Sequence, residues 1–122
     1  RQRQMCIRDR NYKIRKPVFL MPVIESAYGI EKSFEIASSS KNIVAMAIGL
    51  EDFTASIGVA RTDAGKESFY ARTRLVNAAK AAGIQPIDSV FSNIDDMEAL
   101  RLNVAQSKSL GFEVWVVYIP DK

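Results

Sequence analysis

The sequence predicts an α/β fold, in which helices cover a parallel β-sheet. Short apolar segments alternate with longer amphipathic ones in the order β-α-β-α-β-α-β. The apolar segments are nearly continuous, which is typical of parallel strands that are buried on both faces. The length of 122 residues, with 48% hydrophobic and 25% charged residues, suits one globular domain.

The first predicted strand covers residues 18–24 and ends at Glu25. Pro22 within it is tolerable only near a strand end or a bulge, because proline cannot donate a hydrogen bond to a neighbouring strand. The amphipathic segment that follows predicts a helix over residues 30–38. A second buried strand is expected over residues 43–48.

Gly49 closes the second strand, and a loop is expected between it and the next helix. That helix, the longest in the chain, is predicted over residues 68–82, where Gly83 provides the C-terminal cap. Residues 84–91 predict a third, weaker strand.

The last predicted elements are a helix and a fourth strand. Asp95 is expected to cap a helix that runs to Leu110 and stops at Gly111. Residues 114–118 are apolar enough to form the strand. Aromatic side chains along the chain are expected in the core, because they dominate packing energy. These are Phe19, Phe34, Phe69, Phe91 and Trp115.

Two observations favour part of a closed barrel over a small open sheet. The strands recur at intervals of roughly 25 to 40 residues, as in a TIM-type (β/α)₈ barrel of about 250 residues. Acidic residues also follow successive strands, at Glu25, at Glu51 and Asp52, and at Asp88. Ligands of parallel α/β folds bind at this edge. We therefore expect a fragment that corresponds to the C-terminal half of such a barrel.

Charge divides the chain into a basic tail and a mildly acidic body. Residues 1–16 carry a net charge of +6, whereas the whole chain carries +3, so the remainder is acidic. A basic tail can bind nucleic acid, but a solvated or non-native extension is the favoured interpretation, and no nucleic-acid partner is expected. Residues 1–10 resemble translated sequencing-adaptor read-through, and we expect them to be non-native. No segment is long and apolar enough to span a membrane. Because no secretory signal is found, a cytoplasmic protein is expected.

The residue types present exclude several kinds of catalytic site. Cys6 is the only cysteine, and the chain contains no histidine. Histidine-based zinc sites, Ser-His-Asp triads and Cys-His dyads are therefore excluded within this sequence. Its chemistry must use carboxylates, Lys, Arg, Tyr, backbone amides or a hard metal ion.

The acidic residues after the first two strands could share a cation. Neighbouring parallel strands lie about 4.8 Å apart, so Glu25 and Asp52 could bind one Mg²⁺, which takes one or two protein carboxylates and completes its shell with water and substrate oxygens. Spacing alone leaves an alternative open, in which Glu25 caps a helix and Asp52 is a solvated loop residue.

The segments around these carboxylates resemble a known family. Residues 21–29 and 49–58 are similar to citrate lyase β-subunits, malyl-CoA lyases and HpcH/HpaI-type aldolases. The resemblance continues through residues 70–84 and 87–91, in the same order and spacing, and covers roughly residues 17–113. The domain expected over residues 17–122 is accordingly a partial HpcH/HpaI aldolase/citrate lyase domain.

The resemblance implies a fold, a reaction and a cofactor. The fold is a (β/α)₈ barrel of the phosphoenolpyruvate/pyruvate-binding type, and the cofactor is Mg²⁺. The acyl-thioester branch is favoured by Glu51-Asp52 and by the helix that carries Arg72 and Arg74. Its implied reaction cleaves a carboxylated 3-hydroxyacyl thioester, of citryl or malyl type, to an acetyl-type thioester and a 2-oxo acid. The carrier would be coenzyme A or an acyl carrier protein, and the full-length protein a homo-oligomer. An aldolase or thioesterase that uses the same metal site, and an inactive fragment, are the alternatives.

The resemblance also assigns roles to individual residues. Glu25 and Asp52 match the two metal ligands. Gly49, Glu51 and Asp52 match the turn that holds the substrate carboxylate, and glycine lets a ligand approach the backbone closely. Asp88 either shapes the substrate pocket or is an ordinary turn residue.

No catalytic residue is assigned within the sequence. The family's arginine lies on an earlier strand, outside these 122 residues. Arg61, Arg72 and Arg74 are instead expected at surface or helix-facing positions. The chain also departs from the family near residues 118–120, where Tyr-Ile-Pro stands in place of Ile-His-Pro.

Overall fold

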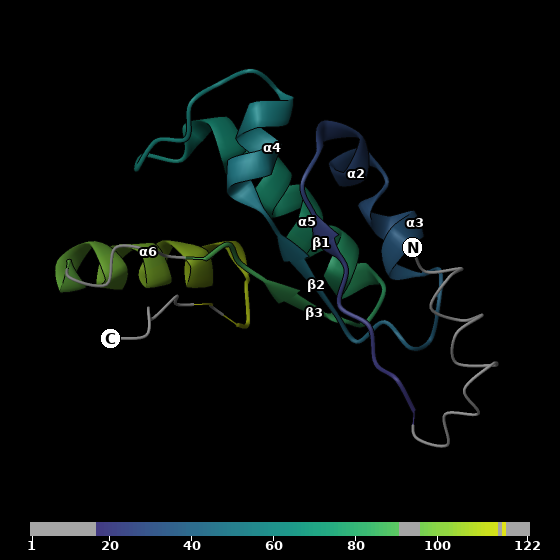
Figure 1. The fold of residues 1–122 in the computed structure, drawn as a ribbon. Helices are drawn as coiled ribbons and strands as arrows, with labels where there is room; N and C mark the ends of the chain where they lie inside the picture. The colour runs from purple at the N-terminus through teal and green to yellow at the C-terminus, as the bar shows by residue number, and fades with distance from the viewer. Residues whose placement is uncertain (1–16, 91–95, 115, 117–122) are drawn as a thin grey trace, which may run out of the picture.

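A computed structural model describes residues 17–90, 96–114 and 116, which form a small α/β unit (Figure 1). Three parallel strands make one sheet in the order β1-β2-β3. They are β1 (Val23–Ile24), β2 (Ala45–Ile48) and β3 (Gln85–Ile87). The α/β class and the parallel sheet are thus confirmed, whereas closure into a barrel stays a prediction.

The first strand is shorter than predicted. Parallel pairing begins with a bridge between Leu20 and Ile43 and resumes only at Val23. Pro22 lies between the two pairings; its carbonyl accepts the Ala47 N–H at 3.0 Å, but its nitrogen has no hydrogen to donate. The expectation that residues 18–24 are buried on both faces is wrong, because Val23 is 47% exposed.

The predicted helix over residues 30–38 is two short helices that begin earlier, α2 (Ala27–Glu31) and α3 (Ser33–Ala37). Ser26 caps α2, since its hydroxyl accepts the Gly29 N–H at 3.1 Å. Ser26 was not predicted as a cap, and the predicted helix start at residue 30 lies about one turn too late.

The segment after β2 is a helix rather than the predicted loop. All four residues of β2 are buried, and α4 (Leu50–Ser56) follows directly, with Gly49 at its N-cap position. Phe53 and Leu50 are buried on one side of α4. Seven residues are too few to display a helical period, which explains why this helix was missed.

The helix predicted over residues 68–82 is confirmed as the centre of the packing. A 3₁₀ turn, η1 (Lys66–Ser68), leads into α5 (Phe69–Ala81), which lies along the sheet (Figure 1). Its apolar side chains form one core cluster with the side chains of β1 and β2 that face it. The buried members from these three elements are Ala71, Leu75, Val76, Ala78, Ala79, Ile24, Met46 and Ile48.

The last described helix, α6 (Met97–Leu110), has the predicted end but a different cap. Asp96 caps it by accepting the Ala99 N–H at 2.9 Å, whereas Asp95 lies outside the described residues. Gly111 ends the helix with a φ of 96°, which favours glycine. Beyond it, Val114 forms a parallel bridge with Ile87. This bridge stands where the fourth strand was predicted, and most of residues 114–118 lie outside the described part.

The prediction that these aromatic side chains lie in the core is wrong for those that the structure describes. Phe19, Phe34 and Phe69 are exposed, while Phe53 and Phe112 are the buried phenylalanines. Phe91 and Trp115 lie outside the described residues. In the described part of the chain, no helix is both long and apolar enough to cross a bilayer.

Candidate metal centre and adjoining pocket

Glu25 and Gly49 are brought side by side by the first two strands. Ile24 pairs with Ile48 in the parallel register, and the Gly49 N–H donates to the Ile24 carbonyl at 2.9 Å. Glu25 follows β1 and Gly49 follows β2, so both lie at the carboxyl edge of the sheet.

The Glu25 side chain lies over the Gly49 backbone. A β-carbon at residue 49 would lie 2.6 Å from Glu25 Cγ and 2.7 Å from Glu25 Oε1, closer than two such atoms can approach. The Gly49 φ of −104° is open to any residue. The backbone conformation therefore does not require glycine, but the Glu25 side chain can occupy this space only because residue 49 has no β-carbon.

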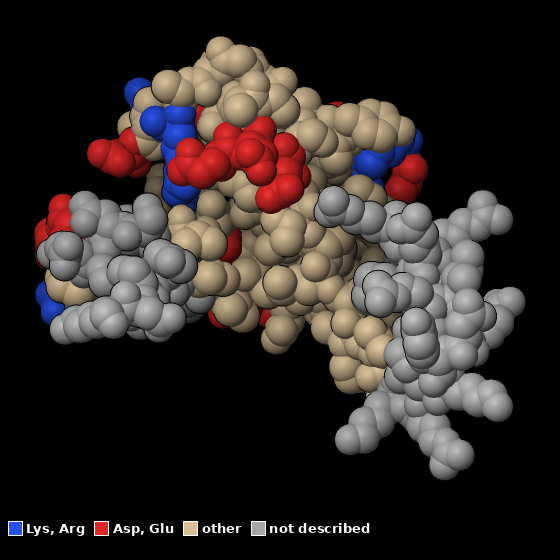
Figure 2. All heavy atoms as spheres, viewed as in Figure 1, with Lys and Arg blue, Asp and Glu red and all other residues tan. Residues whose placement is uncertain are grey.

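Asp52 stands in the first turn of α4 and is exposed. The alternative that made it a loop residue is wrong, because α4 begins at Leu50. A carboxylate in the first turn is favoured by the partial positive charge of the helix N-terminus. Figure 2 shows acidic side chains gathered on the face formed by α4 and the adjoining end of β1.

The two predicted ligands are available to a cation. Among the described residues, neither the Glu25 nor the Asp52 carboxylate has a hydrogen-bond or ion-pair partner. No three Asp, Glu, Cys or His side chains of the described chain gather as a metal-binding group. Mg²⁺ needs only one or two protein carboxylates, and carboxylate oxygens are the hard ligands that it prefers. Both carboxylates therefore have the ligand chemistry that Mg²⁺ takes, and the binding of one ion by the two stays a prediction.

Glu51, beside Asp52 in the sequence, points to another partner. Its carboxylate accepts a hydrogen bond from Arg61 at 2.8 Å, and the Glu51 side chain is 76% exposed. This ion pair ties the segment after α4 back to the first turn of that helix. Exposed ion pairs contribute little stability, so its main effect is to position Arg61.

Asp88 is buried and forms an ion pair that the sequence did not predict. Its Oδ2 accepts hydrogen bonds from Arg72 and from Ser107, while its Oδ1 accepts the Ser89 N–H at 2.8 Å. Arg72 is only 3% exposed and its guanidinium lies 5.6 Å from the centre of the Phe112 ring. Of the two positions expected for Arg72, at the surface or facing a helix, the surface position is therefore wrong.

The position of Arg72 within its helix is the signal that could have predicted its burial. Arg72 precedes Leu75, Val76 and Ala79 by three, four and seven residues, which places it on the buried stripe of α5. Arg74, two residues later, is half-buried and donates to the Glu31 carbonyl at 3.4 Å.

Ser89 links the end of β3 to α4. Its hydroxyl accepts the Leu50 N–H at 3.4 Å, so the first N–H of α4 is satisfied by the neighbouring strand. Ser89 was not singled out from the sequence, since a serine after a strand is common in turns.

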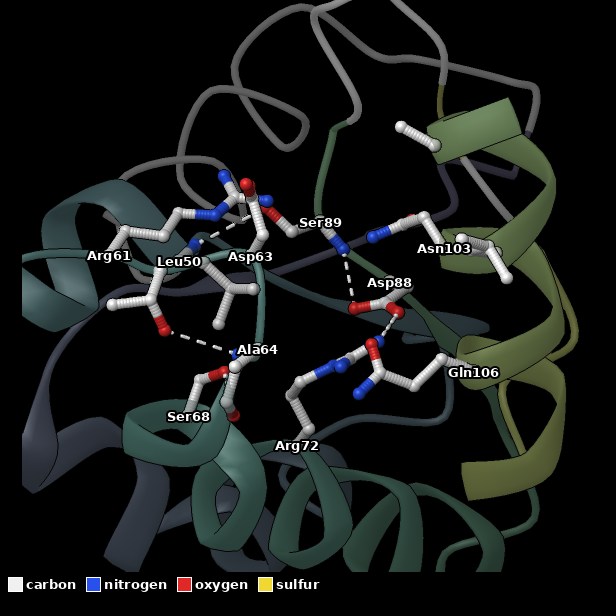
Figure 3. A pocket seen from close by; sticks show the side chains of 14 residues that line it. Leu50, Arg61, Asp63, Ala64, Ser68, Arg72, Asp88, Ser89, Asn103 and Gln106 are labelled. Atoms are coloured by element: carbon white, nitrogen blue, oxygen red, sulfur yellow. Dashed lines mark hydrogen bonds and ion pairs between the residues drawn. The ribbon is translucent and has the colours of Figure 1, made fainter. Parts of the chain in front are cut away.

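A pocket of about 580 Å³ opens beside this network (Figure 3). Its walls come from the segment before η1, the first turns of α5, the end of β3 and one face of α6. Arg72 and Asp88 lie on its floor, and Arg61 and Asp63 on its rim (Figure 3). Asp88 thus lines a pocket, and its predicted role in shaping the substrate pocket stays a prediction. Glu25 and Asp52 do not line it.

Hydrogen bonds shift the pKa values of two groups near the start of α5, one in η1 and one in the first turn of the helix. The Thr62 backbone N–H and hydroxyl donate to the Glu67 carboxylate at 2.8 and 2.7 Å and lower the pKa of that carboxyl. The Tyr70 hydroxyl donates to Glu31 at 2.8 Å, which raises the pKa of the phenol. These contacts fix the loop before η1 and join α5 to α2.

Comparison with known proteins gives consistent matches. The sequence model described as HpcH/HpaI aldolase/citrate lyase matches residues 1–120. The chain is 37% identical over 94 residues to citrate lyase subunit beta of Haemophilus influenzae, covering 77% of this chain and 32% of that protein. It is 34% identical over 113 residues to L-malyl-CoA/beta-methylmalyl-CoA lyase of Cereibacter sphaeroides, covering 79% and 36%.

A solved structure shares the fold. Protein CitE from Mycobacterium tuberculosis, in complex with magnesium, acetoacetate and coenzyme A, superimposes with a TM-score of 0.75 at 29% identity. The match covers 85% of this chain and 40% of that one. The chain spans about a third of the length of the two curated relatives.

Proposed function

The chain belongs to the HpcH/HpaI aldolase/citrate lyase family, and from this premise we propose that the whole protein is a Mg²⁺-dependent carbon–carbon lyase. Its substrate is a carboxylated 3-hydroxyacyl thioester of citryl or malyl type. The products are an acetyl-type thioester and a 2-oxo acid. The observation that carries the proposal is the Glu25 carboxylate, which lies against Gly49 at the edge of the sheet and has no protein partner among the described residues.

Glu25 and Asp52 would hold the metal ion. When bound, Mg²⁺ would orient the substrate and stabilise the negative charge that develops on its oxygen as the carbon–carbon bond breaks. The chain's own contribution is positional. β1 and β2 set Glu25 beside Gly49, α4 sets Asp52 in its first turn, and Ser89 fixes where that helix begins.

The substrate carboxylate would lie near the start of α4. The backbone N–H groups of Glu51 and Asp52 are in the first helical turn, where no intrahelical acceptor is available to them. Asp88 would act indirectly, since its two oxygens are occupied by Arg72, Ser107 and Ser89. It would hold the pocket wall and would not contact substrate.

The barrel of the family is the proposed fold of the whole protein. Val23 on β1 and Met21, which precedes that strand, are both apolar and about half exposed, as expected of side chains that further parts of a barrel would cover. Coenzyme A is the proposed carrier, because the relative from Cereibacter sphaeroides is named for malyl-CoA. The protein is further proposed to assemble as a homo-oligomer.

Cleavage assays with the whole protein test this function. Citryl-CoA and malyl-CoA are offered with Mg²⁺ or with a chelator, to the wild type and to Glu25→Ala and Asp52→Ala. Each substitution should lower kcat/KM by at least about 100-fold, because a lost ligand removes the metal and its charge stabilisation. Glu35→Ala, an exposed glutamate on α3, is the matched control and should leave the rate unchanged.

The substrate series also separates the related reactions. Cleavage of free 2-oxo-acid aldols without a thioester would indicate an aldolase, and release of free coenzyme A without carbon–carbon cleavage would indicate a thioesterase. Undiminished cleavage by both Glu25→Ala and Asp52→Ala would refute the metal site itself.

A further inference from the structure

The pocket beside Asp88 contains a second set of polar groups that the proposed lyase site does not use. It lies between the segment 61–65, η1, α5 and α6 (Figure 3). None of the proposed metal ligands lines it. A ligand group bound there would be held by other residues.

Arg72 reaches into this pocket with hydrogen-bond donors to spare. Its Nη2 donates both to Asp88 and, at 3.0 Å, to Ser107. Its Nε is buried and has no acceptor within the described residues. A buried donor without a partner is costly, and most native structures satisfy such groups with protein, water or ligand. Asp88 and Ser107 hold Nη2 and leave Nη1 for another acceptor.

Three polar side chains lie near the side of Gly65 that faces the pocket. A β-carbon built on Gly65 would lie 3.7 Å from Ser68 Oγ, 3.8 Å from Arg72 Nη1 and 3.9 Å from Gln106 Nε2. These groups come from η1, α5 and α6, so three elements converge on one small volume. Gly65 also has a φ of 62°, a conformation that favours glycine and keeps this volume free of a side chain.

The chemistry of these side chains favours a ligand atom that accepts hydrogen bonds. The arginine and amide nitrogens can only donate hydrogen bonds, whereas the Ser68 hydroxyl already donates to the Gly65 carbonyl at 3.1 Å. Arg61 adds a second cation on the rim (Figure 3). The lining acids, Asp63 and Asp88, balance these two charges, so recognition would depend on the directed donors and not on a net positive field.

We infer that the pocket at Gly65 is a subsite for an oxyanion group, carboxylate or phosphate, of a bound ligand. The oxygen binds in the pocket beside Gly65, where Arg72 and Gln106 can donate to it, and the Arg72–Asp88 ion pair presents the guanidinium to it. This subsite is independent of the Glu25 and Asp52 metal site and does not require Mg²⁺.

Calorimetric titration of the whole protein with inorganic phosphate and, separately, with acetate tests the inference in the presence of EDTA. At least one probe should bind saturably to the wild type. Gln106→Glu should weaken that binding at least tenfold, because it places a negative charge beside the oxyanion. Gln106→Met, which removes the donor without adding charge, should weaken it several-fold and serves if Gln106→Glu fails to fold.

Two further variants are controls that show whether the probes bind in this pocket. Asn77→Asp adds the same charge at an exposed position of α5, away from the pocket, and should bind as the wild type does. Asp52→Asn should also bind as the wild type does, so that failure of the metal proposal is distinguished from failure of this one. Phosphate binding alone would point to a phosphorylated carrier, and acetate binding alone to a substrate carboxylate.

The inference is overturned if neither probe binds saturably. It is equally overturned if Gln106→Glu and Gln106→Met bind with wild-type affinity, or if Asn77→Asp weakens binding as much as Gln106→Glu does.

Discussion

The carboxylate of Glu25 lies against the α-carbon of Gly49, in space that a β-carbon would occupy. That β-carbon would be 2.6 Å from Glu25 Cγ. The contact crosses the ladder between β1 and β2, whose parallel register sets the two residues side by side. The position of a proposed metal ligand therefore depends on the absence of a side chain at residue 49.

Gly49→Ala tests this dependence. The new methyl group must displace the Glu25 side chain, which is exposed and can move, so the fold should tolerate it. Stability should fall by about 1 kcal/mol, since alanine is a poorer N-cap residue than glycine. Mg²⁺ affinity should fall by about 10- to 100-fold, as is typical when the support of a metal ligand is lost. Urea denaturation and calorimetric titration with Mg²⁺ measure the two effects.

A double-mutant cycle provides the control for Gly49→Ala. In a Glu25→Ala background, the same substitution should have no further effect on Mg²⁺ affinity, because the displaced side chain is already gone. Additive losses in the double variant would show that Gly49 acts independently of Glu25.

Removal of one partner of the buried Arg72–Asp88 pair should be strongly destabilising. Asp88→Ala leaves Arg72 charged and unpaired in a buried position, which should cost about 3–5 kcal/mol. Adding Arg72→Leu to Asp88→Ala should recover part of that loss, because no unpaired charge is left behind. Urea denaturation measures each variant.

The exposed pair of Lys32 and Glu35 is the comparison for the buried one. Glu35→Gln should change the free energy of unfolding by less than about 1 kcal/mol, as for most exposed pairs. An equally small loss for Asp88→Ala would mean that water reaches Arg72 and that the pair is not buried in solution.

The strands and the long helix could be predicted from the sequence because their patterns are long or strongly apolar. The strand predicted over residues 43–48 and the helix predicted over residues 68–82 rest on such patterns, and the structure has β2 at Ala45–Ile48 and α5 at Phe69–Ala81. Short elements gave no such pattern. α4 has seven residues, and its N-cap is a glycine, which does not distinguish a helix start from a turn.

The exposed and buried aromatic residues could not be separated by hydrophobicity alone. Phe69 begins α5 on its exposed side, while Phe112 follows Gly111 and packs into the core. The candidate carboxylates could be predicted from the order of the strands along the chain, because the carboxyl ends of parallel strands meet at one edge of the sheet. The Arg72–Asp88 pair did not, because it joins residues whose proximity depends on how α5 packs on β3.

Glu67 should titrate below the ordinary range of a glutamate. The Thr62 backbone N–H, with help from its hydroxyl, lowers the pKa of the Glu67 carboxyl in the folded state. Its contribution to stability is therefore present above the unfolded-state pKa and is lost as pH falls through the folded-state pKa. NMR titration of the Glu67 side chain measures the midpoint. Thr62→Val removes only the hydroxyl donor and should raise that pKa part of the way, and no change would mean that the hydroxyl contact is absent in solution.

Tyr70 should ionise at higher pH than an unperturbed tyrosine. Its hydrogen bond to Glu31 favours the protonated phenol and raises the pKa of Tyr70. The stability from this contact is present below the unfolded-state pKa and is lost as pH rises through the folded-state pKa. NMR of the Tyr70 ring follows the titration. Glu31→Gln should move the pKa of Tyr70 back toward its ordinary value, and an unchanged midpoint would refute the contact.

A crystal structure of the whole protein grown with Mn²⁺ tests the central claim most directly, because the ion's anomalous scattering locates it without assumption. We predict one peak bound by a carboxylate oxygen of Glu25 and one of Asp52, each at about 2.1–2.3 Å. Strong peaks only elsewhere, or an ion held by one of the two carboxylates while the other points away, would contradict the proposed metal site.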